Sequence, residues 1–245
     1  MKRLACIVLF IAGAAWGYRP FDGTDADVAG LGELELELGP AHYYRNQRAG
    51  YLIAPAAVLN LGVLPGVELV TDLKDFVGLS SVAGEQRARL LDTDLLLKWN
   101  YREGVIQEKS GLSMAVEAGL LAPEAGGEDG FGATANFIES YRWPALTLHL
   151  NSQVSYTRGH DLDLFQGLIA VGPFQWHVRP VAEVWIEHTF GVDQTGASAL
   201  AGVIWVPRDG LAFDAALRLA HEDGQRALEI RAGFTWSFEV FGKPQ

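Results

Sequence analysis

The chain has 245 residues, of which 49% are hydrophobic and 20% are charged, so it is too apolar for a disordered chain. Its 19 Lys and Arg against 30 Asp and Glu give a formal net charge of −11 with no basic run, which excludes nucleic acid as an expected partner. The only cysteine, Cys6, excludes an internal disulfide and a cysteine-rich zinc site.

Residues 1–17 are typical of a secretory signal peptide. Lys2 and Arg3 precede an apolar stretch, and small residues lead to a cleavage site after Gly17. The apolar stretch is shorter than the ~20 residues that a transmembrane helix needs. We therefore expect an exported chain whose mature part, residues 18–245, is a single domain without a linker.

Apolar and polar side chains alternate along most of the mature chain. From Leu228 to Phe238, every second side chain is apolar and most of those between are polar. Successive side chains of a strand point to opposite faces, so this pattern predicts strands with one apolar and one polar face. The twelve segments predicted as strands are 31–39, 50–62, 66–75, 90–102, 111–121, 131–141, 145–156, 161–171, 176–189, 197–206, 211–220 and 227–238. Three of them, 161–171, 176–189 and 197–206, alternate less regularly than the rest.

This strand content is well above the ~20–25% of an ordinary globular domain. Most segments have the ~9–11 residues of a strand that crosses a bilayer. In a closed sheet, every backbone N–H and C=O group finds a hydrogen-bond partner on a neighbouring strand. A barrel in lipid needs this, because lipid tails offer no partners. We predict an all-β fold, a closed antiparallel transmembrane β-barrel of about twelve strands in the outer membrane.

The connections between the segments alternate in length. Tight-turn signals such as 65–66 and 207–210 alternate with longer polar stretches, although 103–110 is long where a short turn is due. Outer-membrane barrels have short periplasmic turns and longer external loops, so we expect both termini in the periplasm. The expected long external loops are 39–49, 76–89 and 122–130.

Alternation alone does not distinguish a membrane barrel from a soluble one, because the two differ in which face meets the surroundings. The signal peptide, the even strand count and the aromatic residues near segment ends favour the membrane barrel. The aromatic residues expected at the two membrane interfaces are Trp99, Tyr101, Trp143, Tyr156, Trp176, Phe190, Trp205 and Trp236. An exported soluble β-barrel that binds a partner is the alternative.

Short motifs near the mature N-terminus are similar to those of a known exported family. In chain order they are Arg19-Pro20-Phe21, Thr24-Asp25-Ala26, Gly32-Glu33-Leu34-Glu35-Leu36-Glu37, Ala54-Pro55-Ala56 and Asn60-Leu61-Gly62. Over residues 19–75 the chain thereby resembles the transporter-like outer-membrane barrels labelled "MetA-pathway of phenol degradation". The resemblance implies a Gram-negative outer-membrane barrel associated with uptake of aromatic or other small molecules. Its partners would be outer-membrane lipid and the barrel-assembly machinery, although a tail follows the aromatic residue Phe238 that this machinery would read.

No catalytic arrangement is found in the sequence. An outer-membrane phospholipase would need a His and a Ser two residues apart, on one face of a strand. His149 and Ser152 are three residues apart and point to opposite faces. The cluster of His160, Asp161 and Asp163 is more typical of a solvated loop than of a metal site. We therefore expect no enzyme, no cofactor and no metal.

The polar faces of the predicted strands carry twelve acidic and six basic residues on the inferred interior side. These are Glu33, Glu35, Glu37, Glu68, Asp72, Lys74, Asp92, Asp94, Lys98, Arg102, Glu117, Arg179, Glu183, Glu187, Asp214, Arg218, Glu229 and Arg231. The charges either pair across the lumen and hold the barrel closed, or line a pore or ligand site of negative potential. Closure of the barrel predicts that the first-strand carboxylates lie near Glu229 and Arg231.

These observations predict passage of small solutes, hydrophobic or aromatic compounds among them. Charges between low-dielectric walls focus their field, so we expect a preference for cations that weakens when Glu33, Glu35 and Glu37 are changed to Gln. A barrel of twelve strands has a narrow interior. A structural or adhesive barrel whose lumen is plugged by its own side chains is therefore the second hypothesis.

Overall fold

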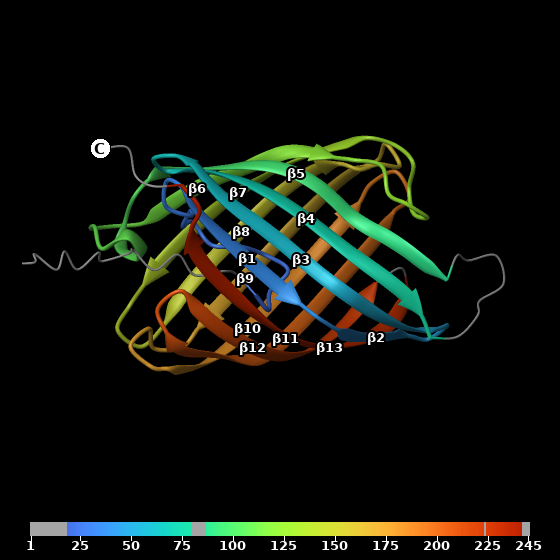
Figure 1. Ribbon diagram of the computed structural model, residues 1–245. Coiled ribbons are helices and arrows are strands. Elements are labelled where there is room, and N and C mark those ends of the chain that lie inside the picture. The colour runs from blue at the N-terminus through green and yellow to red at the C-terminus, as the bar shows by residue number, and fades with distance from the viewer. Residues whose placement is uncertain (1–18, 80–86, 223, 242–245) are drawn as a thin grey trace, which may run out of the picture.

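The computed structural model describes residues 19–79, 87–222 and 224–241, so the predicted signal peptide lies outside it. The alternating segments form the strands that their pattern predicts (Figure 1). In chain order the elements are β1 (Glu33–Gly39), β2 (His42–Asn46), β3 (Gly50–Leu64), β4 (Val67–Gly78), β5 (Ala88–Arg102), the 3₁₀ helix η1 (Val105–Gln107), β6 (Ser113–Leu121), β7 (Gly132–Arg142), β8 (Thr147–Tyr156), β9 (Leu162–Val171), β10 (Val178–Thr189), β11 (Gln194–Arg208), β12 (Leu211–Glu222) and β13 (Gln225–Glu239). No helix in these ranges is long and apolar enough to cross a membrane.

The strands form one antiparallel sheet that closes on itself (Figure 1). β1 and β2 share one position in it, because both pair with β13 on one side and with β3 on the other. The break between them contains Pro40, whose nitrogen cannot donate a ladder hydrogen bond. The prediction of a closed, all-β, antiparallel barrel of twelve strand positions is therefore confirmed.

The predicted external loop at 39–49 is wrong. The chain stays extended beyond Pro40, and the tyrosine-rich β2 continues the first strand position, so that only residues 47–49 connect it to β3. The loop predicted at 122–130 does separate β6 from β7. The loop predicted at 76–89 lies partly outside the described residues, and β4 and β5 extend into it from both sides.

The two faces of the sheet differ sharply in chemistry. On β5 the outward side chain of Leu95 is 50% exposed, whereas that of Lys98 on the inner face is only 4% exposed. Glu183 on the inner face of β10 is 2% exposed. A soluble barrel would place charge outside and apolar groups inside, so this inverted arrangement identifies a barrel whose exterior meets lipid.

We expect Leu217→Arg to destabilise the barrel strongly. Leu217 lies midway along β12 and faces outward, and an arginine at the bilayer midplane costs a transmembrane barrel roughly 2–4 kcal/mol. Urea unfolding in phospholipid vesicles measures this cost, with Leu217→Ala as the uncharged control. Equal stability of the two variants would contradict a lipid-facing position.

Aromatic side chains mark both ends of the barrel. The start of β1 and the end of β13 lie at one end, which we call the terminus end (Figure 1). Exposed tryptophans gather there, and Tyr156 and Phe190 are exposed at the opposite end. The tryptophans at the terminus end are Trp99, Trp143, Trp176, Trp205 and Trp236. Rings at these two levels match the interfacial girdles of outer-membrane barrels.

The three strands with irregular alternation, β9, β10 and β11, pair as regularly as the others. Their inner faces hold buried apolar side chains, among them Ile169, Val181 and Leu200. The inner wall of this side of the barrel is thus partly apolar, which explains why the contrast between the faces is weak in the sequence.

Candidate functional site: the barrel interior

Residues 19–30, which we call the inner segment, precede β1 and lie inside the barrel. The Ala29 amide donates to Oε2 of Glu68 on β4 at 2.6 Å, and the Gly23 amide donates to Oε1 of Glu183 on β10 at 2.8 Å. β4 and β10 are half a turn of the barrel apart. The inner segment therefore crosses the lumen and is bonded to opposite walls.

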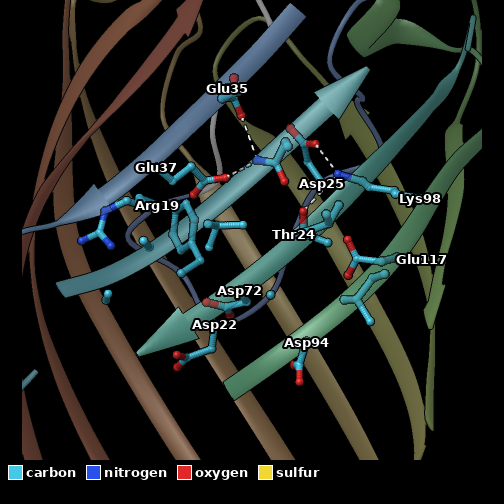
Figure 2. A pocket seen from close by; sticks show the side chains of 18 of the residues that line it. Arg19, Asp22, Thr24, Asp25, Glu35, Glu37, Asp72, Asp94, Lys98 and Glu117 are labelled. Carbon is cyan, nitrogen blue, oxygen red and sulfur yellow. Dashed lines mark hydrogen bonds and ion pairs between the residues drawn. The ribbon is translucent and has the colours of Figure 1, made fainter. Parts of the chain in front are cut away.

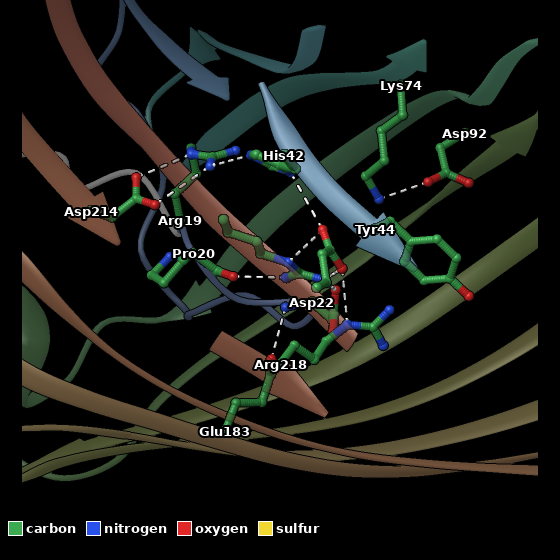
Figure 3. Close-up of polar contacts among 12 residues, drawn as sticks. Arg19, Pro20, Asp22, His42, Tyr44, Lys74, Asp92, Glu183, Asp214 and Arg218 are labelled. Carbon is green, nitrogen blue, oxygen red and sulfur yellow. Dashed lines mark hydrogen bonds and ion pairs between the residues drawn. The ribbon is translucent and has the colours of Figure 1, made fainter. Parts of the chain in front are cut away.

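Asp22 is the most connected residue of the inner segment (Figure 3). Its Oδ1 accepts from Nη2 of Arg231 at 2.6 Å, and its Oδ2 accepts from Nε1 of Trp185 at 2.8 Å. Its amide donates to Oε2 of Glu183 at 2.9 Å. Side chains of β10 and β13 thus hold one aspartate in place from two directions.

The barrel wall behind Asp22 carries a buried charge network. Arg218 on β12 lies opposite Glu229 on β13 in the strand register, and its Nε donates to Oε2 of Glu229 at 3.0 Å. Arg231 donates to the same oxygen at 2.9 Å, and Nδ1 of His42 lies 3.4 Å from the other carboxylate oxygen. Opposite charges on neighbouring strands therefore pair here, and Arg231 links the network to the inner segment.

The N-terminal end of the inner segment is anchored to the same side. Arg19 pairs with Asp214 on β12, with 3.1 Å between Nε and Oδ2 (Figure 3). Its Nη2 also lies 2.8 Å from Nε2 of His42. The carbonyl oxygen of Pro20 accepts from Arg231 at 2.7 Å. These contacts fix the first residues of the inner segment to β2, β12 and β13.

Lys98 on β5 anchors the middle of the inner segment (Figure 2). Its Nζ lies 3.3 Å from Glu68, 3.7 Å from Asp25 and 3.2 Å from Oγ1 of Thr24. Burial raises the pKa of Asp25 to about 7, although the nearby Lys98 opposes this shift. Lys98 thus links Asp25 and Thr24 of the inner segment to Glu68 on the barrel wall.

The carboxylates of the first strand form an acidic ladder inside the barrel. Nδ2 of Asn60 donates to Glu37 at 2.9 Å and to Glu35 at 3.4 Å, and Oγ of Ser237 donates to Glu35 at 2.8 Å. Glu33 lies nearer the terminus end and accepts from the Gly30 amide at 3.1 Å. Neutral donors therefore bind all three carboxylates.

The expected proximity of this ladder to Glu229 and Arg231 is wrong. Glu35 lies opposite Ser237 and Glu37 lies opposite Thr235, whereas Glu229 lies opposite Tyr44 of β2. The reason is the continuation of the first strand position into β2, which moves the ladder toward the terminus end.

The remaining candidate residues lie at the two mouths of the barrel or beside its cavities. Lys74 pairs with Asp92 at 2.6 Å and Arg158 pairs with Asp94 at 2.5 Å, both toward the end opposite the termini. Glu187 is half-buried on the inner face of β10. Arg102 was expected inside but is exposed at the rim, where the ladder between β5 and β6 shifts its register.

A cavity of about 170 Å³ lies between the inner segment and the wall formed by β1, β3, β4 and β5. Figure 2 shows that its lining is dominated by carboxylates. The acidic lining residues are Asp22, Asp25, Asp27, Glu35, Glu37, Glu68, Asp72, Asp94, Glu117 and Glu229, and the basic ones are Arg19, Lys74, Lys98 and Arg231. Acidic side chains therefore outnumber basic ones in the lining of this cavity.

Sequence reasoning missed the inner segment and the neutral residues that bind it. Asn151 on β8 accepts from the Thr24 amide at 3.0 Å, and Ser140 on β7 accepts from the Ala26 amide at 3.0 Å. On a strand with one polar face, such residues cannot be told from residues that meet water. The available signal was the stretch before the first strand, which is rich in Asp and Gly and does not alternate.

No protein-family profile and no curated protein matches the sequence. An outer membrane channel from Pseudomonas putida F1 has a TM-score of 0.67 at 8% identity, covering 89% of this chain and 100% of that one. The KdgM porin has a TM-score of 0.54 at 10% identity, and KdgM in complex with disordered oligogalacturonate has 0.53 at 11%, covering 84% of this chain and 99% of theirs in both cases. At these identities the likeness shows the fold, which is that of an outer-membrane β-barrel.

Proposed function

We propose that the protein is a non-enzymatic outer-membrane channel for small solutes, in which the inner segment controls the opening of the lumen. The observation that carries the proposal is the bonding of residues 19–30 to opposite walls of the barrel. A segment that crosses the lumen limits what passes, and its displacement would widen the path.

The way in which the inner segment is held supports this proposal. Hydrogen bonds and ion pairs bind it to the wall at several positions along its length. Within the described residues, Ala26 is its one member of a buried apolar cluster, with Ile106, Ala115 and Ile138. Polar contacts can be exchanged for water when a segment moves, whereas a large apolar contact would resist displacement.

We extend the proposal to hydrophobic or aromatic solutes on two grounds. The inner faces of β9, β10 and β11 are partly apolar, with Ile169, Val181 and Leu200 buried there. The motifs within residues 19–75 resemble the family labelled with phenol degradation. Outer-membrane lipid and the barrel-assembly machinery remain the partners that we propose.

A second candidate function is a structural barrel with a closed lumen. It is favoured by the same inner segment and by the ion pairs that fill the interior on β12 and β13. Planar-bilayer conductance and liposome swelling with the purified protein distinguish the two. Ion conductance and flux of small solutes support the channel, whereas neither under any condition supports the structural barrel.

We expect the channel to prefer cations and this preference to weaken in Glu35→Gln/Glu37→Gln. Both carboxylates line the acidic cavity, where they contribute to the excess of negative charge. The reversal potential across a potassium chloride gradient measures the selectivity. Glu103→Gln, a change at the exposed rim, is the matched control. Anion preference in the unmodified protein would contradict the cavity as the ion path.

A further inference from the structure

The rim of the barrel opposite the terminus end carries its exposed charges in two separate groups. We expect this rim to face the outside, because we expect both termini in the periplasm. In the described connections between β6 and β7, β8 and β9, and β10 and β11, the exposed carboxylates are Glu128, Asp129 and Asp193, and no Lys or Arg is exposed. From β12 through β13, β2 and β3 to β5, the exposed arginines described at this rim are Arg45, Arg48, Arg87 and Arg226.

Arg45 on β2 and Arg226 on β13 point away from the lumen. Tyr44 and Glu222 bond to each other inside the barrel, with 3.2 Å between Oη and Oε2. Alternation therefore places Arg45, which follows Tyr44, on the outer face. His221 precedes Glu222 and faces outward for the same reason, and Arg226 lies opposite it in the strand register.

The two arginines are neighbours across the ladder between β2 and β13. Leu228 lies opposite Arg45, and Arg226 is two residues before Leu228 on the same face. Such diagonal neighbours are roughly 7–8 Å apart, which long side chains can span. Two guanidiniums that start this close can donate to the oxygens of one phosphate group.

These cations are not neutralised by the protein around them. Among the described residues, the side chains of Arg45, Arg48 and Arg226 make no hydrogen bond and no ion pair. The acidic residues described nearby, Asp75 and Glu222, are partly buried, and Glu222 already pairs with Arg218. The exposed guanidiniums are therefore available to an anion outside the barrel.

The level of the arginines on the barrel matches that of lipid headgroups. Toward the middle of the barrel the same outer face becomes apolar, with Leu219 and Ile230 exposed on β12 and β13. The arginines thus lie where the lipid-facing apolar band ends, and their long stems can carry the charge to the interface. A cation at this level meets lipid phosphates.

We propose that Arg45 and Arg226, flanked by Arg48 and His221, bind a phosphate group of lipid A, the phosphorylated glycolipid of the external leaflet. Charge complementarity carries this choice, since the carboxylates on the other side of the rim disfavour phosphate there. The inference names one lipid among the outer-membrane lipids proposed above as partners. It does not depend on conduction through the lumen, so its failure would leave the channel proposal standing.

Native mass spectrometry of the purified protein in detergent micelles, titrated with bis-phosphorylated lipid A, tests this site. We expect binding about tenfold weaker in Arg45→Gln/Arg226→Gln, because two charged donors to phosphate are lost. Arg102→Gln/Arg208→Gln removes two exposed arginines from the terminus end and is the matched control. It should bind lipid A as the unmodified protein does.

Two further measurements identify the lipid. Lipid A without its phosphates, and phosphatidylglycerol, should both bind the unmodified protein far more weakly than bis-phosphorylated lipid A does. Less lipopolysaccharide should copurify from outer membranes with Arg45→Gln/Arg226→Gln than with the control.

Heat-modifiable gel mobility verifies that each variant is folded. Equal lipid A binding by the folded double variant and its control would overturn the proposal. Equal binding of lipid A and phosphatidylglycerol by the unmodified protein would also overturn it, because the patch would then recognise anionic lipid in general.

Discussion

Deletion of residues 19–30 is expected to raise the single-channel conductance several-fold. The inner segment crosses the lumen between β4 and β10, so its removal leaves a wider path lined by the strands alone. Planar-bilayer recording measures the change. Heat-modifiable mobility verifies that the shortened chain still forms a barrel, whose strand ladders do not involve the deleted residues.

Point variants of the inner segment should raise the single-channel conductance by smaller amounts. Asp22→Ala removes the acceptor for Arg231 and Trp185, so it should raise the conductance by less than the deletion does. Asp27→Asn keeps an acceptor for Gln107 and is the control within the same segment. A deletion variant that forms barrels but conducts no better than the full chain would show that the segment does not limit passage.

Glu229→Gln should cause the second large effect, a loss of roughly 3–5 kcal/mol in the free energy of unfolding, as expected when one partner of a buried ion pair is removed. Glu229 is buried between Arg218 and Arg231 and is the shared acceptor of both. Its neutralisation leaves two neighbouring guanidiniums with less negative charge beside them. Urea unfolding in vesicles, followed by tryptophan fluorescence, measures the loss.

Glu222→Gln is the matched control for this prediction. Glu222 also pairs with Arg218, but it lies at the end of β12 and is partly exposed. An ion pair that solvent screens contributes about 0–1 kcal/mol. Equal effects of the two substitutions would contradict the central place of Glu229 in the network.

The strands and their two faces could be predicted from the sequence because alternation is a local property. The alternating run from Leu228 to Phe238 lies within β13. Which face meets lipid could not be derived from alternation, since soluble and membrane barrels share it. The exposure of Leu95 and the burial of Lys98 decide that question only in the folded chain.

The interior was harder to predict because it depends on contacts between residues far apart in the chain. Residues 19–30 carry no periodic signal, and their partners Asn151 and Glu183 are far from them in sequence. The register between β1 and β13 depends on whether the chain stays extended past Pro40, which local turn signals did not indicate. The acidic ladder was therefore placed on the correct strand but beside the wrong neighbours.

The most direct test of the channel proposal is a reversible cross-link that fixes the inner segment to the wall. A Cβ added at Gly23 would lie 3.1 Å from Cγ of Asn151 on β8, close enough for a disulfide in Gly23→Cys/Asn151→Cys. The only native cysteine, Cys6, lies in the predicted signal peptide, so no other thiol should compete.

Solute flux through this variant in liposomes is measured before and after reduction with dithiothreitol, with each single-cysteine variant as a control. The proposed function predicts little flux in the oxidised form and a several-fold rise on reduction. Equal flux in the oxidised and reduced forms would contradict control of the lumen by the inner segment.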